Sequence, residues 1–344
     1  MNTTPFTKSL HDESRLLFAL RFMAFPVLAI VLYPLFIVGV GSDNAVIQCM
    51  WVIILTYCLF CVGGAFHEAA HDTLFRNTAT NRIVGRAIGM VIGIPFTVYK
   101  ETHRQHHACL NTSGDYELWP YSDPATSLAF RRFFVWLDLC VGVVTSPWIY
   151  GRIYFSGDSV LKPEARRTIR MEYLEMGGAW LVLIGGLVLI LNAREYDWRQ
   201  FDSVWLLPLL LSPVANTGRK FVEHLGLTSR EPLLGTRTVV GGNRLSRLFR
   251  YLNFDIAVHG PHHRYPKARH FELAPRLEEY QSAYPDQLVP VFPSYLSAFL
   301  HTLPCLWKNP ATGDHSASMP NWTLGKRLTC DEDRGCPAQT LDVE

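Results

Sequence analysis

Long uncharged runs of apolar residues restrict what this chain can fold into. Phe22–Gly41 and Ala45–Phe66 each have about the 20 apolar residues that a helix needs to cross a bilayer, and a short Gly-Ser-Asp-Asn turn separates them. Met176–Ala193 and Ser203–Gly218 form a second pair around a charged segment, and the prolines of the last run are tolerated in a membrane helix. The pattern predicts an all-α polytopic membrane protein with four transmembrane helices in two hairpins.

The distribution of charge agrees with this topology. Apolar residues make up 49% of the chain and charged residues only 18%. If both hairpin turns face outward, only Arg194 and Arg199 of the 32 lysines and arginines lie outside, as the positive-inside bias requires. We therefore expect a multi-pass integral membrane protein with both termini in the cytoplasm. We expect no nucleic-acid partner, because no basic block is interleaved with aromatic residues.

Three other apolar segments are less suited to crossing a bilayer. Val84–Tyr99 is short and glycine-rich and contains a proline, so we expect it at the membrane interface. Phe133–Tyr150 is interrupted by an aspartate and a proline and is ambiguous. Gln287–Trp307 contains several prolines and a histidine and is expected to lie on the surface. The polar composition of residues 308–344 predicts a disordered tail after one membrane domain, residues 1–307, with hairpins near 22–66 and 176–218.

Eight of the 13 histidines fall into three short clusters, H-E-A-A-H, H-R-Q-H-H and H-G-P-H-H. Residues at i, i+3 and i+4 share one side of a helix, so each cluster is expected to present its imidazoles in one direction. Neutral imidazole binds Fe, Zn, Cu and Ni, and eight such ligands are more than one tetrahedral ion can use. The pattern predicts two metal ions, with a histidine from E-H-L-G as a ninth ligand. The predicted ligands are His67, His71, His103, His106, His107, His224, His259, His262 and His263.

The four remaining histidines stand alone and are expected to have ordinary structural roles; they are His11, His270, His301 and His315. The predicted topology places all the clustered ones on the cytoplasmic side, provided that Phe133–Tyr150 stays outside the bilayer. Metal-bound imidazoles usually donate their second N–H to a carboxylate or carbonyl. Acids near the clusters could accept these bonds, although each could equally be a solvated surface group; they are Glu68, Asp72, Asp115, Glu223 and Asp255.

The ligand set and its position indicate the kind of chemistry. Neutral nitrogen ligands leave the positive charge on the metal, next to the hydrocarbon of the membrane. Zinc would suit hydrolysis but has no redox chemistry. A pair of redox metals at this position instead points to O2 activation and attack on an unactivated C–H bond.

The three clusters in their order resemble the membrane fatty acid desaturase superfamily. The resembling segments are H-E-A-A-H-D-T-L-F, Y-K-E-T-H-R-Q-H-H-A-C-L-N and H-G-P-H-H-R-Y-P. The resemblance implies a four-helix membrane core with a cytosolic cap that holds a di-iron centre, and it implies that the nine histidines are iron ligands. Many members have Asn four residues before the third cluster, where this chain has Asp255. Gly260-Pro261 inside that cluster is also unusual, and proline fits the first turn of a helix, so a helix is expected to begin there.

The resemblance favours a fatty acyl desaturase that uses two iron ions and O2, with a carotenoid ketolase or hydroxylase as the alternative. No flavin or nicotinamide fingerprint occurs, so electrons are expected from a separate donor such as a ferredoxin or cytochrome with its reductase. H-E-A-A-H also matches the H-E-x-x-H motif of zinc metalloproteases, but this alternative leaves two clusters unexplained. A transporter is disfavoured, because the expected spans are nearly free of charge.

Overall fold

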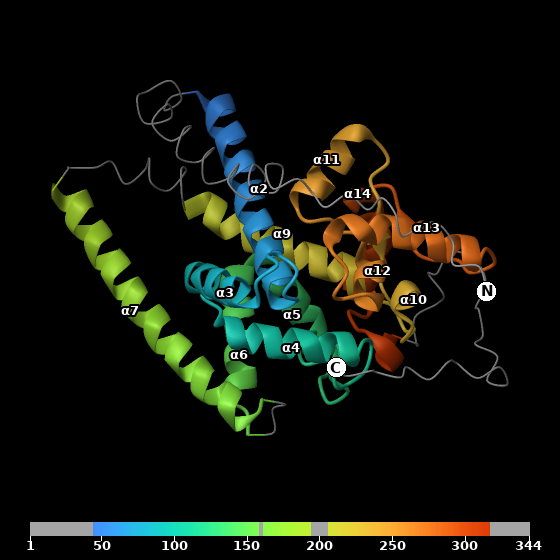
Figure 1. Ribbon diagram of the computed structural model, residues 1–344, viewed down its shortest axis with the longest axis horizontal. Coiled ribbons are helices and arrows are strands. Elements are labelled where there is room, and N and C mark those ends of the chain that lie inside the picture. The colour runs from blue at the N-terminus through green and yellow to red at the C-terminus, as the bar shows by residue number, and fades with distance from the viewer. Residues whose placement is uncertain (1–43, 158–160, 194–205, 317–344) are drawn as a thin grey trace.

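The computed structural model describes residues 44–157, 161–193 and 206–316, and nearly all of their regular structure is helical (Figure 1). The all-α prediction is confirmed for these residues, whose only sheet is a parallel pair of two-residue strands with Thr238 opposite Val291. The elements are α2 (Ala45–Ala70), α3 (Thr78–Ile92), α4 (Phe96–Ala108), α5 (Leu128–Cys140), α6 (Gly142–Phe155), α7 (Pro163–Ala193), α9 (Leu207–His224), α10 (Pro232–Gly235), β1 (Thr238–Val239), α11 (Arg244–Leu252), α12 (His259–Arg264), η4 (His270–Glu272), α13 (Leu273–Ala283), β2 (Val291–Phe292), α14 (Tyr295–Lys308) and η5 (Gly313–Ser316).

Helix α2 has the length and composition of a membrane span. It has 26 residues, and its most apolar stretch of 18 residues has a mean hydropathy of 2.3. The side chain of Asn44 caps its first turn by accepting hydrogen bonds from the amides of Val46 and Ile47. Within the described part of the chain, α2 is the one straight helix long and apolar enough to cross a bilayer, or one of up to two if the bent pair α3–α4 is counted. The expected span Phe22–Gly41 lies outside the described residues.

Helices α7 and α9 contain the other two expected spans. The C-terminal half of α7 stands apart from the remaining helices in Figure 1. Its large apolar side chains are exposed there, and those of Leu181, Val182 and Leu189 are 72–76% exposed. A surface of this kind is unusual for a protein in water and typical of contact with lipid or with another protein. Helix α9 begins within the expected span Ser203–Gly218 and continues to His224.

The two other apolar segments in the first half of the chain are each divided between two helices. Val84–Tyr99 is shared by α3 and α4, whose axes differ by 102°. The break falls at Gly93, whose φ of 76° ends α3, and at Pro95, which precedes α4. Phe133–Tyr150 is divided between α5 and α6 at Val141. Neither segment therefore forms one straight helix.

Asp138, the acid that interrupts Phe133–Tyr150, is fully buried and paired. Lys220 on α9 donates from Nζ to Asp138 Oδ2 at 2.9 Å. The hydroxyls of Thr145 and Tyr121 also donate to this carboxylate. Removing one partner of a buried ion pair typically costs about 3–5 kcal/mol, because the other charge is left without compensation. The pair therefore holds α5 and α6 against α9.

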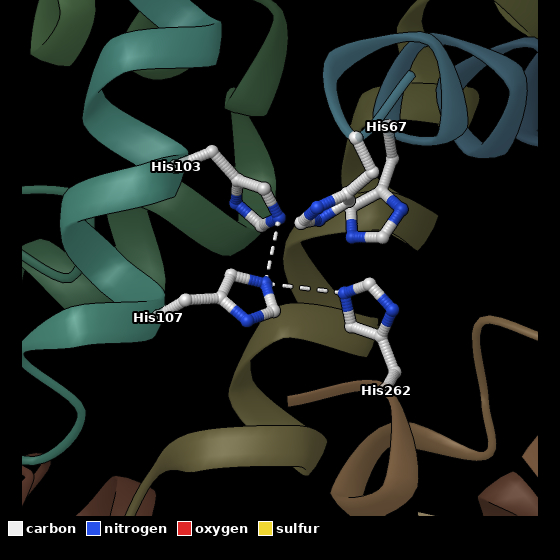
Figure 2. Close-up of side chains that lie close together, drawn as sticks. His67, His103, His107 and His262 are labelled. Atoms are coloured by element: carbon white, nitrogen blue, oxygen red, sulfur yellow. Dashed lines mark hydrogen bonds between the residues drawn. The ribbon is translucent and has the colours of Figure 1, made fainter. Parts of the chain in front are cut away.

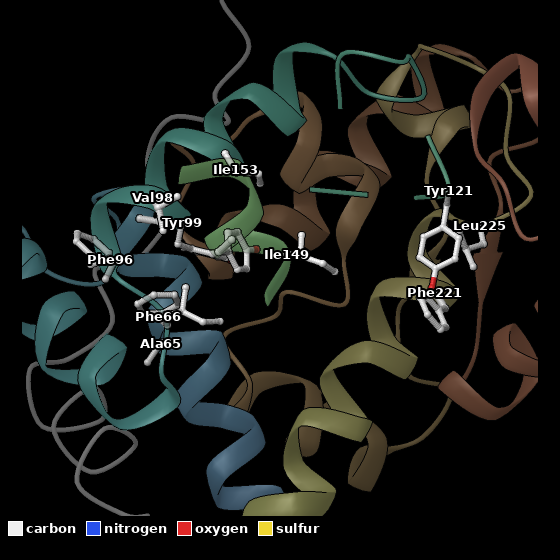
Figure 3. Packing of buried hydrophobic residues seen from close by; sticks show 14 of the residues in the cluster. Ala65, Phe66, Phe96, Val98, Tyr99, Tyr121, Ile149, Ile153, Phe221 and Leu225 are labelled. Carbon is white, nitrogen blue, oxygen red and sulfur yellow. The ribbon is translucent and has the colours of Figure 1, made fainter. Parts of the chain in front are cut away.

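A hydrophobic core lies beside the ends of the helices that carry the histidine clusters (Figure 3). Phe66, near the end of α2, packs on Phe96 and Tyr99 of α4, with ring centroids 5.6 and 4.5 Å away. Phe221 of α9 packs edge to face on Tyr121, with centroids 5.2 Å apart. All five side chains are at least nine-tenths buried. These contacts fix the end of α2 against α4, and the end of α9 against the loop that follows α4.

The folded domain extends further toward the C-terminus than the composition of the sequence suggested. Gln287–Trp307 forms β2 and most of α14, which buries one side and exposes the other, in agreement with a surface location. The predicted disordered tail began at residue 308, but residues 309–316 are packed into the domain. The amide of Thr312 donates to the Tyr121 carbonyl, and that of Gly313 donates to the Leu227 carbonyl. These backbone bonds order a segment that composition alone marks as polar; the rest of the tail lies outside the described residues.

Candidate metal centre

The nine histidines predicted as ligands come from four helix segments. They are His67 and His71 at the end of α2, His103, His106 and His107 on α4, His224 at the end of α9, and His259, His262 and His263 on α12. Helix α12 begins at His259, as the proline of the third cluster suggested. Gly260 is needed there because a Cβ would lie only 3.1 Å from Thr238 Oγ1 and 3.2 Å from Leu233. The glycine thus lets α12 pack closely on α10 and β1.

The structure sorts these histidines into two groups. In each group the nitrogens that could bind a metal all lie within 4.8 Å of one another. The first histidine group comprises His67, His71, His103, His107 and His262. The second histidine group comprises His106, His224, His259 and His263.

The clusters do not each point in one direction, contrary to the expectation from their spacing. Successive residues of a helix are rotated by about 100°, so residues four apart are separated by only about 40°. His103 and His107 accordingly share the first group, whereas His106 enters the second. Helix α12 shows the reverse division, since His259 and His263 lie in the second group. Both helices therefore run between the two groups and contribute to each.

The spacing of the nitrogens fits metal coordination. In the first group, His107 Nε2 lies 3.2 Å from His103 Nε2 and 3.1 Å from His262 Nε2 (Figure 2). In the second group, His259 Nε2 lies 2.8 Å from His224 Nε2 and 3.1 Å from His263 Nε2. Metal–nitrogen bonds of about 2.0–2.1 Å place adjacent ligand nitrogens about 3 Å apart. Each group thus matches the donor atoms around one ion.

Two buried nitrogens of the first group also fit a metal. Among the described residues, His67 Nε2 and His71 Nε2 have no hydrogen-bond partner although both atoms are buried. An unsatisfied buried nitrogen is costly, and a metal ion would satisfy it. Burial and the neighbouring imidazoles also lower the pKa of His107, His262 and His263 well below the usual value of histidine. These rings are therefore neutral at pH 7, which is the form that binds metals.

Two carboxylates orient the histidines of α4. His106 Nδ1 donates to Asp115 Oδ2 at 2.7 Å, and His103 Nδ1 donates to Glu117 Oε2 at 2.8 Å. Burial alone would lower the pKa of His106, but Asp115 outweighs it and raises the pKa to about 9. Burial alone would raise the pKa of Glu117, but the adjacent His103 outweighs it and lowers the pKa to about 2. Because Nδ1 faces a carboxylate in each case, Nε2 is the nitrogen that could bind a metal, which would replace any proton held there. Tyr150 also donates to Glu117, at 3.2 Å.

Two further acids near the clusters contact the histidines less closely. Glu68 Oε1 lies 3.3 Å from His67 Nδ1, while its Oε2 accepts a hydrogen bond from Thr73 at 2.7 Å. Glu223 Oε2 lies 3.6 Å from His259 Nδ1. Both carboxylates are almost completely buried, so they form part of the surroundings of the two groups.

The last two expected acids are paired with other side chains. Asp72 Oδ2 accepts a hydrogen bond from Lys100 at 2.6 Å. Asp255 accepts from Arg250 at 2.6 Å and from His270 Nδ1 at 2.9 Å. Asp72 and Asp255 therefore pair with Lys100, Arg250 and His270, and not with the clustered histidines. Closeness in sequence did not specify the direction of these side chains.

The isolated histidines lie apart from both groups. His270 is buried against Asp255, and Arg237 donates to His301 Nδ1 at 3.3 Å. His315 is half-buried in η5, and His11 lies outside the described residues. Their surroundings agree with the structural roles expected for them.

Glu117 and the residues that hold Glu223 were missed in the sequence. Glu117 lies only two residues after Asp115, in the same loop, which is the signal that could have identified it. Arg219 precedes Glu223 by one helical turn and donates to its Oε2 at 3.0 Å, a spacing at which side chains meet on a helix. Tyr295 donates to Oε1 of the same carboxylate at 3.1 Å, but it comes from α14, and no local pattern indicates this contact.

A narrow cavity of 170 Å³ reaches both histidine groups. His67 and His103 of the first group and His106, His224 and His259 of the second line it. The apolar part of its remaining wall comes from α2, α6 and the α3–α4 turn and includes Leu59, Ile92, Ile94, Val143 and Ile149. The rest of the wall is polar or charged and includes Asn216, Arg219, Lys220 and Glu223 of α9. This cavity is called the histidine cavity below.

Replacing Glu117 with alanine is expected to weaken metal binding or activity by about 10–100-fold, the usual effect of removing a carboxylate that orients a metal-bound histidine. The test is the metal content that each protein retains after dialysis against increasing concentrations of a chelator. Glu101→Ala is the matched control, since Glu101 lies on α4 but pairs only with the exposed Arg104, among the described contacts, in a surface bridge worth about 0–1 kcal/mol. Equal metal retention by both variants would show that Glu117 does not support the site.

Two neighbouring groups of mostly buried histidines, at the ends of helices that include an apolar candidate span, define a helical protein whose site could hold metal ions. The chain belongs to the fatty acid desaturase family, whose model matches residues 45–295, a range that includes all nine histidines. A fatty acid desaturase of Bacillus subtilis (strain 168) is 25% identical over 223 residues, which cover 60% of this chain and 61% of that relative. The chain thus matches about three fifths of the length of this relative.

Proposed function

We propose that this protein is an O2-dependent di-iron oxidoreductase of the membrane that introduces a double bond into a fatty acyl chain. The observation that carries the proposal is the pair of histidine groups, which a partly apolar cavity reaches. Membership of the fatty acid desaturase family and the name of the bacterial relative support this chemistry over the other reactions of such sites.

Iron bound by the two histidine groups would supply the redox chemistry that activates O2 for removal of hydrogen from an unactivated C–H bond. The nine histidines are proposed as its ligands, five in the first group and four in the second. Asp115 and Glu117 hold His106 and His103 in the tautomer that leaves Nε2 available. Electrons are proposed to come from a separate ferredoxin or cytochrome with its reductase.

The histidine cavity is proposed to hold the acyl chain. The apolar side chains on α2, α6 and the α3–α4 turn would contact the acyl chain, and a cavity of 170 Å³ would hold only a short length of it against the histidines. The carbon that is oxidised would then depend on how far the acyl chain enters the cavity, because the core fixes the histidines in place but does not fix the acyl chain.

We also propose that the protein crosses the membrane four times, in hairpins near residues 22–66 and 176–218, as one domain with both termini and the histidines on the cytoplasmic side. The exposed apolar surface of α7 and the composition of α2 support contact with lipid. The histidines of α2 and α9 belong to two neighbouring histidine groups, in agreement with two hairpins whose inner ends lie on one side of the membrane.

The test of the proposal is the product formed by the purified protein. With iron, a ferredoxin and its reductase, O2 and acyl lipids, we expect unsaturated chains in gas chromatography of the fatty acid methyl esters, and none without O2 or iron. Hydroxylated chains or oxidised carotenoids as the only products would instead identify the alternative, a ketolase or hydroxylase of the same superfamily.

The zinc-protease alternative predicts a different response to Glu68→Ala. A protease of the H-E-x-x-H type needs this glutamate as its base and would lose all activity. In the structure Glu68 binds Thr73 and lies beside His67, so a supporting role predicts a loss of lipid oxidation of at most about 100-fold. Residual formation of unsaturated product by Glu68→Ala measures the difference, and proteolysis that Glu68→Ala abolishes would favour the protease.

A further inference from the structure

Helix α11 has the composition of a helix that lies in a membrane surface. Its sequence, RLSRLFRYL, places three arginines on one side and three leucines and a phenylalanine on the other. No residue of α11 is buried, and Leu245, Leu248 and Phe249 are 45–60% exposed. Basic amphipathic helices with exposed apolar side chains bind at the boundary between lipid head groups and acyl chains.

Two of the arginines of α11 are available to an anionic ligand. Arg250 donates to Asp255 and to the Val240 carbonyl. Arg244 and Arg247 are exposed, and neither has a carboxylate partner among the described residues. Because guanidinium groups bind phosphate oxygens well, this pair is suited to a phosphate group.

A second, larger cavity borders α11. It has a volume of 650 Å³, and residues of α2, α9, α11 and α14 line it. Its lining includes Ile53, Phe60, Leu211, Phe249 and Phe299, and its volume falls within the range of about 300–1,000 Å³ that is usual for ligand sites. The hydroxyl of Tyr57 donates to the Phe249 carbonyl, which joins α11 to α2 at the cavity.

This second cavity is separate from the histidine cavity. None of the nine histidines lines it. Arg219 lines both cavities, and it is held between them by its bond to Glu223. A molecule in the second cavity would therefore lie beside the candidate active site without reaching the histidines.

From these observations we infer that α11 and the second cavity form a binding site for an anionic glycerophospholipid of the cytoplasmic leaflet. The phosphate lies at Arg244 and Arg247, and an acyl chain enters the cavity past Phe249. Charge complementarity selects this occupant, because the apolar side of the helix and the cavity suit any lipid, whereas two unpaired arginines favour a negative head group. The inference rests on the membrane location proposed above, but it does not depend on the reaction catalysed.

The experiment measures lipid retained by the full-length protein in detergent, by native mass spectrometry after titration with phosphatidylglycerol or phosphatidylcholine. We expect wild type to retain phosphatidylglycerol in preference. The double variant Arg244→Gln/Arg247→Gln should bind it about 30-fold more weakly, since each arginine near an anionic lipid contributes a factor of about five. Ala215→Phe, which fills the cavity from α9 where Ala215 is exposed, should also release the lipid.

The matched control is Arg167→Gln/Arg170→Gln, which removes two exposed arginines with the same spacing from α7. Retention by this variant, with loss in the two α11-site variants, would support the site. An equal loss in the control, equal binding of phosphatidylcholine, or dimers without lipid would overturn it. Metal content and desaturation are measured in parallel, and unchanged values show that the variants fold. If wild type binds the lipid but forms no unsaturated product, the proposed function is refuted and the lipid site is not. If the arginine variant does not fold, Ala215→Phe decides the result.

Discussion

Replacing His262 with alanine is expected to remove the metal ion of the first histidine group, and replacing its neighbour His263 is expected to remove the ion of the second. The two residues are adjacent in sequence, yet the helical rotation sends their rings into different groups. Purified wild-type protein should therefore contain about two ions per chain, and each variant about one. Activity should fall at least about 100-fold in both, because even the loss of a residue that only orients a ligand costs about 10–100-fold.

Metal analysis of the detergent-purified protein measures the content, and Mössbauer spectroscopy of iron-57 samples distinguishes the remaining ion. His315→Ala is the control, since His315 lies outside both groups, and it should leave the content at the wild-type value. Two zinc ions in place of iron would still support the arrangement of the ligands, because zinc binds the same imidazoles. A single ion that survives both His262→Ala and His263→Ala would contradict two separate metal positions.

The presence of the histidine site could be anticipated from sequence, and helical rotation separates neighbouring histidines, but which helices complete each group could not be anticipated. Spacing showed that clustered imidazoles would come together, because i, i+3 and i+4 neighbours meet on a helix. Which partners His106 and His107 meet depends on where α2, α9 and α12 lie relative to α4, which is a property of tertiary packing. The contacts of Phe66 with Phe96 and Tyr99 fix α2 against α4, and no local pattern encodes them.

Expectations based on one segment at a time were the least accurate. Sequence reasoning did not single out Glu117 and left the role of Asp255 open, because a carboxylate near a cluster can turn either way and its direction is set by residues such as Tyr150 and Arg250. The polar composition of residues 309–316 suggested disorder, but their backbone bonds to the Tyr121 and Leu227 carbonyls offset the loss of chain entropy. The helical class was predicted correctly, since periodicity and length decide it locally, whereas the number of membrane spans stays a prediction.

A tryptophan at Val143 is expected to abolish oxidation of long acyl chains while leaving the metal content unchanged. Val143 lies on α6, lines the histidine cavity and is 37% exposed, so a larger side chain can enter the cavity without disturbing the core. The cavity has a volume of only 170 Å³, so an indole would occupy much of it. We expect kcat/KM for long chains to fall by about 100-fold or more, since a loss of about 3 kcal/mol of binding corresponds to that factor.

The neighbouring substitution Val144→Trp provides the matched control. Val144 is also on α6, but it is 63% exposed and is not among the residues that line the cavity, so it should retain nearly full activity. Activity is measured for acyl chains of several lengths, because a partial block at Val143 should penalise long chains more than short ones. If Val143→Trp oxidised all chains as well as Val144→Trp, the acyl chain would have to reach the histidines by another path. If both variants lost activity together with metal, α6 would be needed for the fold of the metal site. The proposal that the cavity holds the acyl chain would then be tested with Ser146→Trp, which enlarges another lining residue of the same helix.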